Sequence, residues 1–250
     1  MDIELDRIEQ LRNLVKLIDE INSEPYAYFE KDKIVFNALD LGRSCNIWLD
    51  IRASFFKKFI INEPFVTLFS VSDTKKILKK INKNKSVKLG ISDNKIFFKV
   101  VGERRDTDLY LTLIHPNDSS TDEVDAEGIK NLMDYMDSSF TIGITELVET
   151  INTAENFSDE VNMIIQNGEV EFYIDYSALG EFHDRYHIAS AIGNSDTKYS
   201  VFFLKKLASL AGFSKNVKIY ASTNAPLVAE IDNIDYLIRV CISPRIDDDD

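Results

Sequence analysis

Four segments of the chain carry apolar residues at the three- and four-residue spacing that is typical of an amphipathic helix. These segments cover residues 6–22, 72–83, 144–154 and 203–213. The second segment has one apolar stripe, formed by Thr74, Ile77, Leu78 and Ile81. Its predicted cap is Ser72 or Asp73. One face of this helix is therefore predicted to pack against the protein, and the opposite face is left to solvent or to a partner.

Between the helical segments, short runs that are rich in β-branched and aromatic residues predict strands. The predicted strands cover residues 26–29, 34–39, 46–51, 65–71, 87–91, 95–101, 108–114, 162–165, 170–174, 187–192, 199–203, 216–223, 227–231 and 236–242. The pair Asn167-Gly168 predicts a tight hairpin turn. The pattern as a whole predicts an α+β protein with antiparallel sheets.

The order helix, strands, helix, strands occurs twice, and the second copy follows the first by roughly 130 residues, which indicates an internal duplication. A polar and acidic stretch at residues 115–139 separates the copies and has the composition of a linker. We therefore expect two similar domains at 1–114 and 140–246, an interdomain connector at 115–139, and an acidic tail at 247–250.

Positive charge is concentrated in one place. The chain has 29 Lys and Arg against 42 Asp and Glu, a formal net charge of −13, yet six lysines and no acidic residue lie between positions 75 and 85. The lysines opposite the apolar stripe are Lys75, Lys76, Lys79 and Lys83. A solvated charged face is the usual interpretation of such a helix. Segregation of the lysines in an acidic protein instead favours an anionic partner that binds at this face.

Residues with the pattern of a catalytic site are sparse. The nine glycines form neither a dinucleotide-binding motif nor a phosphate loop, and the two cysteines are too far apart in sequence for a zinc-type pair. His183 and His187 have the spacing of a metal pair, but on a strand they would simply share one face. We therefore predict no catalytic residue, metal or cofactor. The alternative is a metal-dependent enzyme that uses His183, Asp184 and His187.

No apolar run approaches the roughly 18 residues of a membrane-spanning helix. The acidic N-terminus lacks the pattern of a signal peptide. Together with the isolated Cys45 and Cys241, these features predict an intracellular protein without a membrane partner.

The carboxyl end carries a specific resemblance. Residues 224–231 and 237–242, then Ser243-Pro244-Arg245-Ile246 before the acidic tail, resemble the ending of the proliferating cell nuclear antigen (PCNA) family. This family comprises the sliding clamps of archaeal and eukaryotic DNA replication. Residues 38–44 resemble its Ala-Met-Asp-x-Ser-x-Val segment, and residues 71–79 resemble its Leu-x-Lys-Ile-Leu-Lys helix. The matches occur in register, and the order of helices and strands extends the resemblance over the whole chain.

The resemblance implies a non-enzymatic ring of three chains that encircles duplex DNA without reading its sequence. The implied partners are two further clamp subunits, identical or related, a clamp loader, and PIP-box-type peptides of DNA polymerase, flap nuclease and ligase. The residues expected to contact DNA are Arg12, Lys16, Lys75, Lys76, Lys79, Lys80, Lys83, Lys205, Lys206 and Lys215. Those expected to line the peptide groove are Leu39, Arg43, Ser44, Ile129, Leu132, Pro226, Cys241, Ser243, Pro244, Arg245 and Ile246. Those expected at the subunit interface are Tyr110, Leu111, Thr112, Leu113, Arg185, His187 and Ala189.

Several residues depart from the family's pattern. Ser44 and Cys241 stand where the family prefers apolar and aromatic groove residues, and the third helix, Thr145–Asn156, has acidic residues but no basic one. These departures suit a divergent archaeal or viral clamp, or one subunit of a mixed ring. The alternative is a clamp-like module that acts in transcription or in a partner complex and never encircles DNA. The expected location is the cytoplasm of an archaeon, or the nucleus or replication site of a eukaryotic or viral system.

Overall fold

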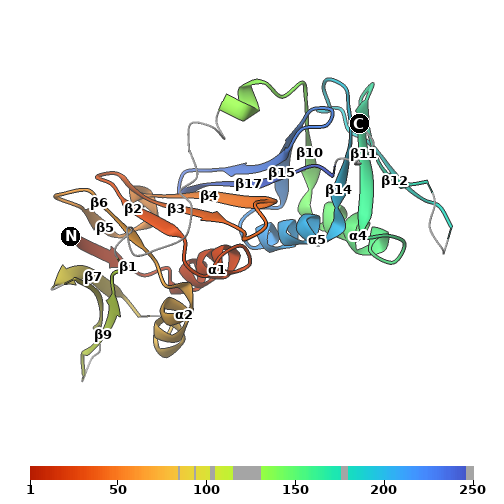
Figure 1. Ribbon diagram of the computed structural model, residues 1–250. Coiled ribbons are helices and arrows are strands. Elements are labelled where there is room, and N and C mark those ends of the chain that lie inside the picture. Colours follow the sequence, from red (N-terminus) through yellow and green to blue (C-terminus); the bar gives the residue numbers. More distant parts are fainter. Residues whose placement is uncertain (84, 93, 102–104, 115–130, 176–179, 246–250) are drawn as a thin grey trace. The chain divides into compact units, whose positions relative to one another are not determined.

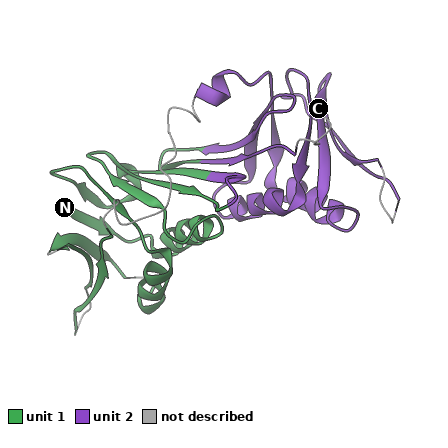
Figure 2. Cartoon of the chain, in the orientation of Figure 1, with its two compact units in different colours: residues 1–41, 47–124, 232–238 green, residues 42–46, 125–231, 239–250 purple. Residues whose placement is uncertain are grey.

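The computed structural model describes residues 1–83, 85–92, 94–101, 105–114, 131–175 and 180–245 (Figure 1). The chain packs into two compact units (Figure 2). Unit 1 comprises residues 1–41, 47–124 and 232–238, and unit 2 comprises residues 42–46, 125–231 and 239–250. The domain and connector boundaries that we expect from the sequence stay a prediction.

In its described residues, unit 1 contains two helices and two runs of antiparallel strands. The helices are α1 (Ile8–Asp19) and α2 (Val71–Lys80), and a short 3₁₀ turn, η1, covers Ala53–Phe55. One sheet has the order β5-β1-β7-β8-β9, with β5 at Lys58–Ile60, β1 at Asp2–Leu5, β7 at Val87–Ser92, β8 at Lys95–Val100 and β9 at Thr107–Thr112. The second run has the order β4-β3-β2-β6, with β4 at Cys45–Arg52, β3 at Lys33–Leu39, β2 at Tyr26–Phe29 and β6 at Phe65–Leu68.

Unit 2 has the same kinds of element. Its helices are α4 (Ile144–Ala154) and α5 (Val201–Leu204), and the 3₁₀ helix η3 (Lys205–Gly212) continues α5. One sheet has the order β13-β12-β11-β14, with β13 at Phe182–His187, β12 at Glu169–Ile174, β11 at Glu160–Gln166 and β14 at Ser195–Ser200. The other run is β10-β15-β16-β17, with β10 at Ser138–Gly143, β15 at Asn216–Ala221, β16 at Leu227–Asp232 and β17 at Tyr236–Ile242.

The two halves of the chain share one topology. In the first half, β1 joins the sheet made by the last three strands, β7, β8 and β9; in the second half, β10 joins β15, β16 and β17 in the same way. The remaining strands correspond as well, because β6-β2-β3-β4 matches β14-β11-β12-β13. The predicted duplication and the predicted α+β fold with paired antiparallel sheets are therefore confirmed.

Helix α2 forms where the sequence predicts it. The predicted apolar stripe is confirmed, because Thr74, Ile77, Leu78 and Ile81 are all buried. The predicted cap is wrong: the hydroxyl of Ser70 accepts the N–H of Asp73 at 3.3 Å, so Ser70 caps the helix from an extended backbone. No helix in the described part of the chain is long and apolar enough to cross a membrane.

Other local predictions are wrong, among them the strand at 199–203, because β14 ends at Ser200 and residues 201–204 form α5. Residues 203–213 are not one α-helix, because α5 passes into a 3₁₀ helix after Leu204, although Leu204, Leu207 and Leu210 are buried as expected. Strand β13 ends at His187, where the predicted strand 187–192 begins, because the chain turns at residues 189–190. Strand β1 escapes prediction since only two buried residues, Ile3 and Leu5, alternate with acidic ones.

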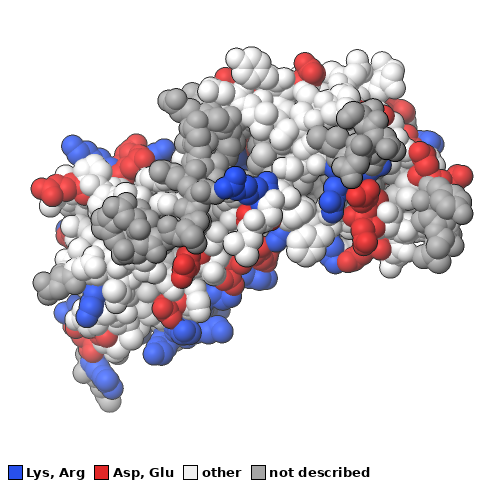
Figure 3. Space-filling view, in the orientation of Figure 1, with Lys and Arg blue, Asp and Glu red and all other residues white. Residues whose placement is uncertain are grey.

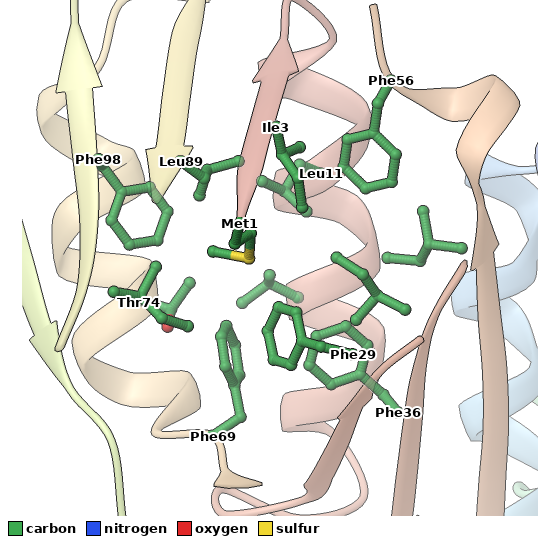
Figure 4. Close-up of a pocket in the computed structure, with 14 residues that line it drawn as sticks. Met1, Ile3, Leu11, Phe29, Phe36, Phe56, Phe69, Thr74, Leu89 and Phe98 are labelled. Carbon is green, nitrogen blue, oxygen red and sulfur yellow. The ribbon is translucent and has the colours of Figure 1, made fainter. Parts of the chain in front are cut away.

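The core of unit 1 is incompletely filled. A cavity of about 50 Å³ with apolar walls lies among the two helices and the strands of both runs (Figure 4). Leu11 and Val15 of α1, Thr74 of α2 and Phe98 of β8 contribute to its lining. The hydroxyl of Thr74 donates to the carbonyl of Ser70 at 2.8 Å, which satisfies the polar atom of this residue.

Candidate nucleic-acid and partner surfaces

The outer face of α2 is strongly positive. Lys76, Lys79, Lys80 and Lys83 are exposed, and blue side chains gather over α2 in Figure 3. Lys79, Lys80 and Lys83 form no ion pair with any residue that the structure describes. Lys76 contacts Asp73 at 2.8 Å, and this hydrogen bond, together with one from Ser70, lowers the pKa of Asp73. The predicted lysine face is thus present as a surface whose charges are mostly uncompensated.

The basic residues that were expected to contact DNA from α1 and from the start of α2 make different contacts. Lys16 is exposed and pairs with no acidic residue among those described. Lys75 pairs with Asp19 at the end of α1. The guanidinium of Arg12 donates to the carbonyls of Leu78 and Ile81, at 2.8 and 2.6 Å. Arg12 therefore satisfies backbone acceptors at the C-terminus of α2 rather than pointing to solvent.

The helices of unit 2 carry a different balance of charge. Lys205 is exposed but pairs with Glu155 at 2.6 Å, and the ammonium of Lys206 lies 5.1 Å from the ring centroid of Phe202. Lys215 is exposed just before β15. Helix α4 has no Lys or Arg, and it presents Glu146 and Glu149 to solvent. The positive face of unit 1 has no equal in unit 2.

The residues that were expected at the subunit interface lie at the two open sheet edges. β9 ends one sheet of unit 1 and β13 ends one sheet of unit 2. Leu111 is buried and Leu113 is half-buried. The other expected interface residues are exposed, namely Tyr110, Thr112, Arg185, His187 and Ala189. Strands in the equivalent places of the two halves, β17 and β4, are joined at their ends by backbone hydrogen bonds. Arg52 N–H donates to the Asp235 carbonyl, and Ser243 N–H donates to the Ser44 carbonyl, each at 2.9 Å.

The β13 edge is held by contacts on both faces of its sheet. On one face, Arg185 and His183 contact the carboxylate of Glu171, at 2.7 and 2.8 Å. Burial raises the pKa of Glu171, and these hydrogen bonds outweigh burial and lower it. On the other face, the Thr150 hydroxyl of α4 contacts Asp184 and Tyr186, each at 2.5 Å. The edge strand is therefore fixed to α4 and to β12 before any partner binds.

The segments expected to form the peptide groove meet in part. Ser44 and Ser243 are joined by a backbone hydrogen bond. The backbone N–H of Arg245 donates to the Lys198 carbonyl at 2.8 Å, and its guanidinium pairs with Glu160 at 3.3 Å. Leu39, Leu132, Pro226 and Pro244 are half-buried, and Arg43 is exposed with a φ of 55°. Ile129 and Ile246 lie outside the described residues.

One residue beside this segment went unnoticed in the sequence. The Ser44–Ser243 bond between antiparallel strands sets Asn46 opposite Cys241. Asn46 is only 7% exposed, and neither polar atom of its side chain has a hydrogen-bond partner among the residues that the structure describes. Burial raises the pKa of the neighbouring Cys241 thiol to about 11. This part of the surface is therefore more polar in composition than an apolar floor.

The histidine pair does not form a metal centre. His183 contacts Glu171 and His187 contacts Glu169, so both lie on one face of β13, as predicted for a strand. Among the described residues, no group of three or more His, Cys, Asp or Glu side chains is placed to hold a metal ion.

A second surface that was missed lies on the sheet of unit 1. An open hollow of about 450 Å³ is lined by Ser92, Lys95, Phe97, Lys99, Asp108 and Tyr110. Ile96, Phe98 and Leu111 are buried on the opposite face, and Phe98 faces the cavity of Figure 4. The alternation of Lys95, Phe97 and Lys99 with buried residues is the sequence signal that pointed to this outward row.

Comparisons with known proteins agree at the level of fold. No protein-family model matches the chain, and no curated protein matches its sequence. Solved structures match over nearly the whole chain. A. fulgidus PCNA bound to the C-terminal region of FEN-1 is 18% identical, with 99% of each chain covered and a TM-score of 0.81. PCNA from Entamoeba histolytica is 15% identical, with 98% of each chain covered and a TM-score of 0.82.

A PCNA2–PCNA3 complex from Sulfolobus tokodaii provides a further match, at 15% identity and a TM-score of 0.80, covering 98% of this chain and 99% of that one. At such identities the likeness shows the fold alone. The chain has the fold of the PCNA sliding clamps, and the resemblance seen in the sequence is confirmed to that extent.

Proposed function

We propose that this chain is one subunit of a DNA sliding clamp, a non-enzymatic ring that encircles duplex DNA and tethers replication enzymes to it. The observation that carries the proposal is the exposed lysine face of α2, in a chain of net charge −13 that has the clamp fold. Among the described residues, no acidic partner pairs with Lys79, Lys80 or Lys83 at this face, or with Lys16 on α1.

The chemistry of this face suits sliding. Lysine ammonium groups on flexible stems contact phosphates and carry no base readout, so binding is independent of sequence and weakens with salt. Individually weak contacts exchange quickly as the duplex moves. Retention on DNA then depends on ring closure rather than on affinity, and the acidic remainder of the surface discourages binding of DNA outside the ring.

Ring closure is proposed to use the edges β9 and β13. An open edge with unpaired backbone groups must be paired or shielded. β4 and β17 hold the corresponding places in the two halves, and their ends are already hydrogen-bonded to each other within the chain. Pairing of β9 with β13 of another subunit would repeat that junction head to tail, as closed rings require. Three subunits, identical or related, are expected from the resemblance, and light scattering of the purified protein tests this number.

The proposed partners are a clamp loader, which would place the ring on DNA, and PIP-box-type peptide motifs of polymerase, flap nuclease and ligase. The solved PCNA of A. fulgidus is bound to the C-terminal region of FEN-1, which supports a peptide groove in this fold. Ser44, Cys241 and Ser243 give our chain a more polar groove segment, so weaker or altered motif preference is expected. Calorimetry with such peptides on the parent protein and on Ile246→Asp tests the groove. Equal binding by both proteins would place it elsewhere.

The deciding experiment compares DNA topologies. The protein is loaded onto nicked circular DNA with a clamp loader, freed of unbound protein by gel filtration, and then the circle is linearised with a restriction enzyme. We expect co-elution with the circle and release from the linear ends. Release from the circle at the same rate as from linear DNA would contradict encirclement.

A second function, a clamp-like module that never encircles DNA, is favoured by one observation. Glu146 and Glu149 make the exposed face of α4 acidic, although α4 belongs to the second helix pair of the same fold. The topology experiment separates this alternative from the first. A protein that is recovered with a partner complex but never retained on circles would support it.

A further inference from the structure

We propose that the outer face of the β7-β8-β9 sheet in unit 1 is a second nucleic-acid site, which binds single-stranded DNA or RNA by stacking a base on Phe97. The site comprises Phe97 and Tyr110 with the lysines 88, 95 and 99 around them. It goes beyond the proposed clamp function, because it lies on the sheet face opposite the helices. Tyr110 also belongs to the β9 edge that is proposed for ring closure, whereas Phe97 and Lys95 lie on β8, inside that edge.

The register of the sheet brings the members of this site together. Phe97 lies opposite Gly90 on β7 and opposite Tyr110 on β9, so the two aromatic residues share one row across the sheet. On one side, Lys99 lies between Lys88 and Asp108; on the other side, Lys95 lies between Ser92 and Thr112. Lys95 and Lys99 are each about 7 Å from Phe97 along the strand, since a strand rises about 3.3 Å per residue.

Gly90 explains why the ring of Phe97 is available. A Cβ placed on Gly90 would meet Phe97 Cζ at 2.2 Å and Cε1 at 2.4 Å, so the end of the ring occupies the space above this glycine. The ring therefore extends from β8 across β7 along the surface of the sheet. Together with Tyr110, which is 59% exposed, it lines the hollow of about 450 Å³. An aromatic side chain lying on a sheet is a platform for an unpaired base.

The charge on this face is mixed, because Asp2 and Glu4 of β1 lie opposite Gly90 and Lys88 in the same rows. The lysines of β8 favour a polyanion as the occupant: Lys95 has no ion-pair partner among the described residues, and Lys99 pairs with Asp106 at 3.2 Å with 42% of its side chain exposed. A base stacked on Phe97 would bring its flanking phosphates toward these two lysines. Asp108 lies at the rim opposite Lys99 and offsets part of the positive charge there, so Lys95 contributes the larger attraction for phosphate. Duplex DNA hides its base faces, so the aromatic row selects for single strands.

The competing explanation is structural: an aromatic ring beside a strand glycine can simply shield the backbone there. Two substitutions separate the explanations. Phe97→Leu keeps an apolar cover over Gly90 but removes the aromatic face, whereas Phe97→Trp keeps and enlarges that face. Tyr135→Ala, which removes an aromatic residue that is 81% exposed elsewhere in the chain, is the matched control.

The experiment measures fluorescence anisotropy of labelled oligothymidylate of about 12 nucleotides, a length within the usual site size. The full-length protein carries Lys76→Glu, Lys79→Glu and Lys83→Glu as a common background, so that α2 does not contribute. We expect Phe97→Leu to weaken binding at least about fivefold, the lower end for loss of one stacked base. Phe97→Trp and Tyr135→Ala should bind as the background protein does, and the melting temperature of Phe97→Leu should not change.

Lys95→Glu gives an independent measurement, because the side chain of this exposed lysine makes no ion pair or hydrogen bond with any described residue. This substitution should weaken binding, and the slope of log affinity against log salt concentration should become shallower by roughly one. Unchanged binding by Phe97→Leu or by Lys95→Glu would overturn the proposal, and so would an equal loss in Tyr135→Ala. Retention of the parent protein on circular DNA does not depend on Phe97, so that assay reports separately on the clamp function.

Discussion

The helix pair of unit 1 and the helix pair of unit 2 have equivalent places in one duplicated topology but a different balance of surface charge. α2 presents three exposed lysines, and Lys83 directly after it adds a fourth. α4, the counterpart of α1, presents Glu146 and Glu149 and no basic residue, and α5 with η3, the counterpart of α2, presents Lys205. The inward residues of α2 and α4 are alike, because Ile77 and Leu78 in α2 and Leu147 and Ile151 in α4 are buried. The apolar stripe fixes the helix in the fold, and the outward residues remain free to diverge. Shared topology therefore does not imply shared contact with DNA.

The largest effect is expected from reversing the positive charge of the lysine face on α2. Reversal of Lys76, Lys79 and Lys83 to glutamate leaves the buried stripe untouched but removes cations that contact phosphates. We expect duplex affinity to fall on the order of a hundredfold, and the salt slope to become shallower by roughly three. Anisotropy titrations at several salt concentrations check this, with Lys31→Glu as the control for a lysine in a distant turn. An unchanged affinity would mean that α2 does not face the duplex.

A smaller effect separates structural cations from binding ones. Arg12→Met should lower the free energy of unfolding by about 2 kcal/mol, because charged hydrogen bonds to two helix-end carbonyls are lost. Duplex affinity should change little. Lys16→Met, one turn along the same helix, should do the reverse. Urea unfolding and DNA titration of both variants decide the matter, and a loss of affinity in Arg12→Met without loss of stability would refute the assignment.

The acidic charge on the exposed face of α4 can be reversed as well. Glu146→Lys with Glu149→Lys should raise duplex affinity by about tenfold and steepen the salt slope by up to about two, if α4 faces the same DNA as α2. Glu149→Lys alone provides a milder version, because Glu146 also accepts the N–H of Gly143 at 3.2 Å. No gain from either variant would indicate that α4 lies away from the duplex, as in the non-encircling module.

The smallest effect concerns Lys205. Glu155→Gln removes the partner of this lysine and makes one further cation available to phosphate. Because exposed ion pairs contribute only about 0.2–1 kcal/mol, we expect little change in stability and a two- to threefold gain in duplex affinity at most. Thermal melting and salt titration measure the two quantities. A gain that persists when Lys205 is also replaced by Met would show that Lys205 is not the cation responsible.

How much the sequence predicts depends on whether the cause is local. The extents of α4 and of the Asn167-Gly168 hairpin follow from periodicity and turn chemistry, and α2 follows apart from its cap. The hydrogen bonds of Arg12 could not be predicted, because the carbonyls that accept them are 66 and 69 residues away in the chain. The row of Phe97 and Tyr110 requires the pairing of β8 with β9, which periodicity alone does not fix. Long-range contacts therefore decide which charges and rings are available for binding.

The apolar cavity of unit 1 has a mechanical consequence. Unfolding eliminates internal voids, so the volume of the system falls when such a unit opens, by an amount on the order of tens of mL/mol for typical proteins. The cavity of about 50 Å³ beneath α1 and α2 makes unit 1 compressible where it supports the lysine face. Hydrostatic pressure is therefore expected to loosen the packing behind α2 early in unfolding. A high-pressure environment would select for larger side chains at Val15 or Leu11, which would fill this void.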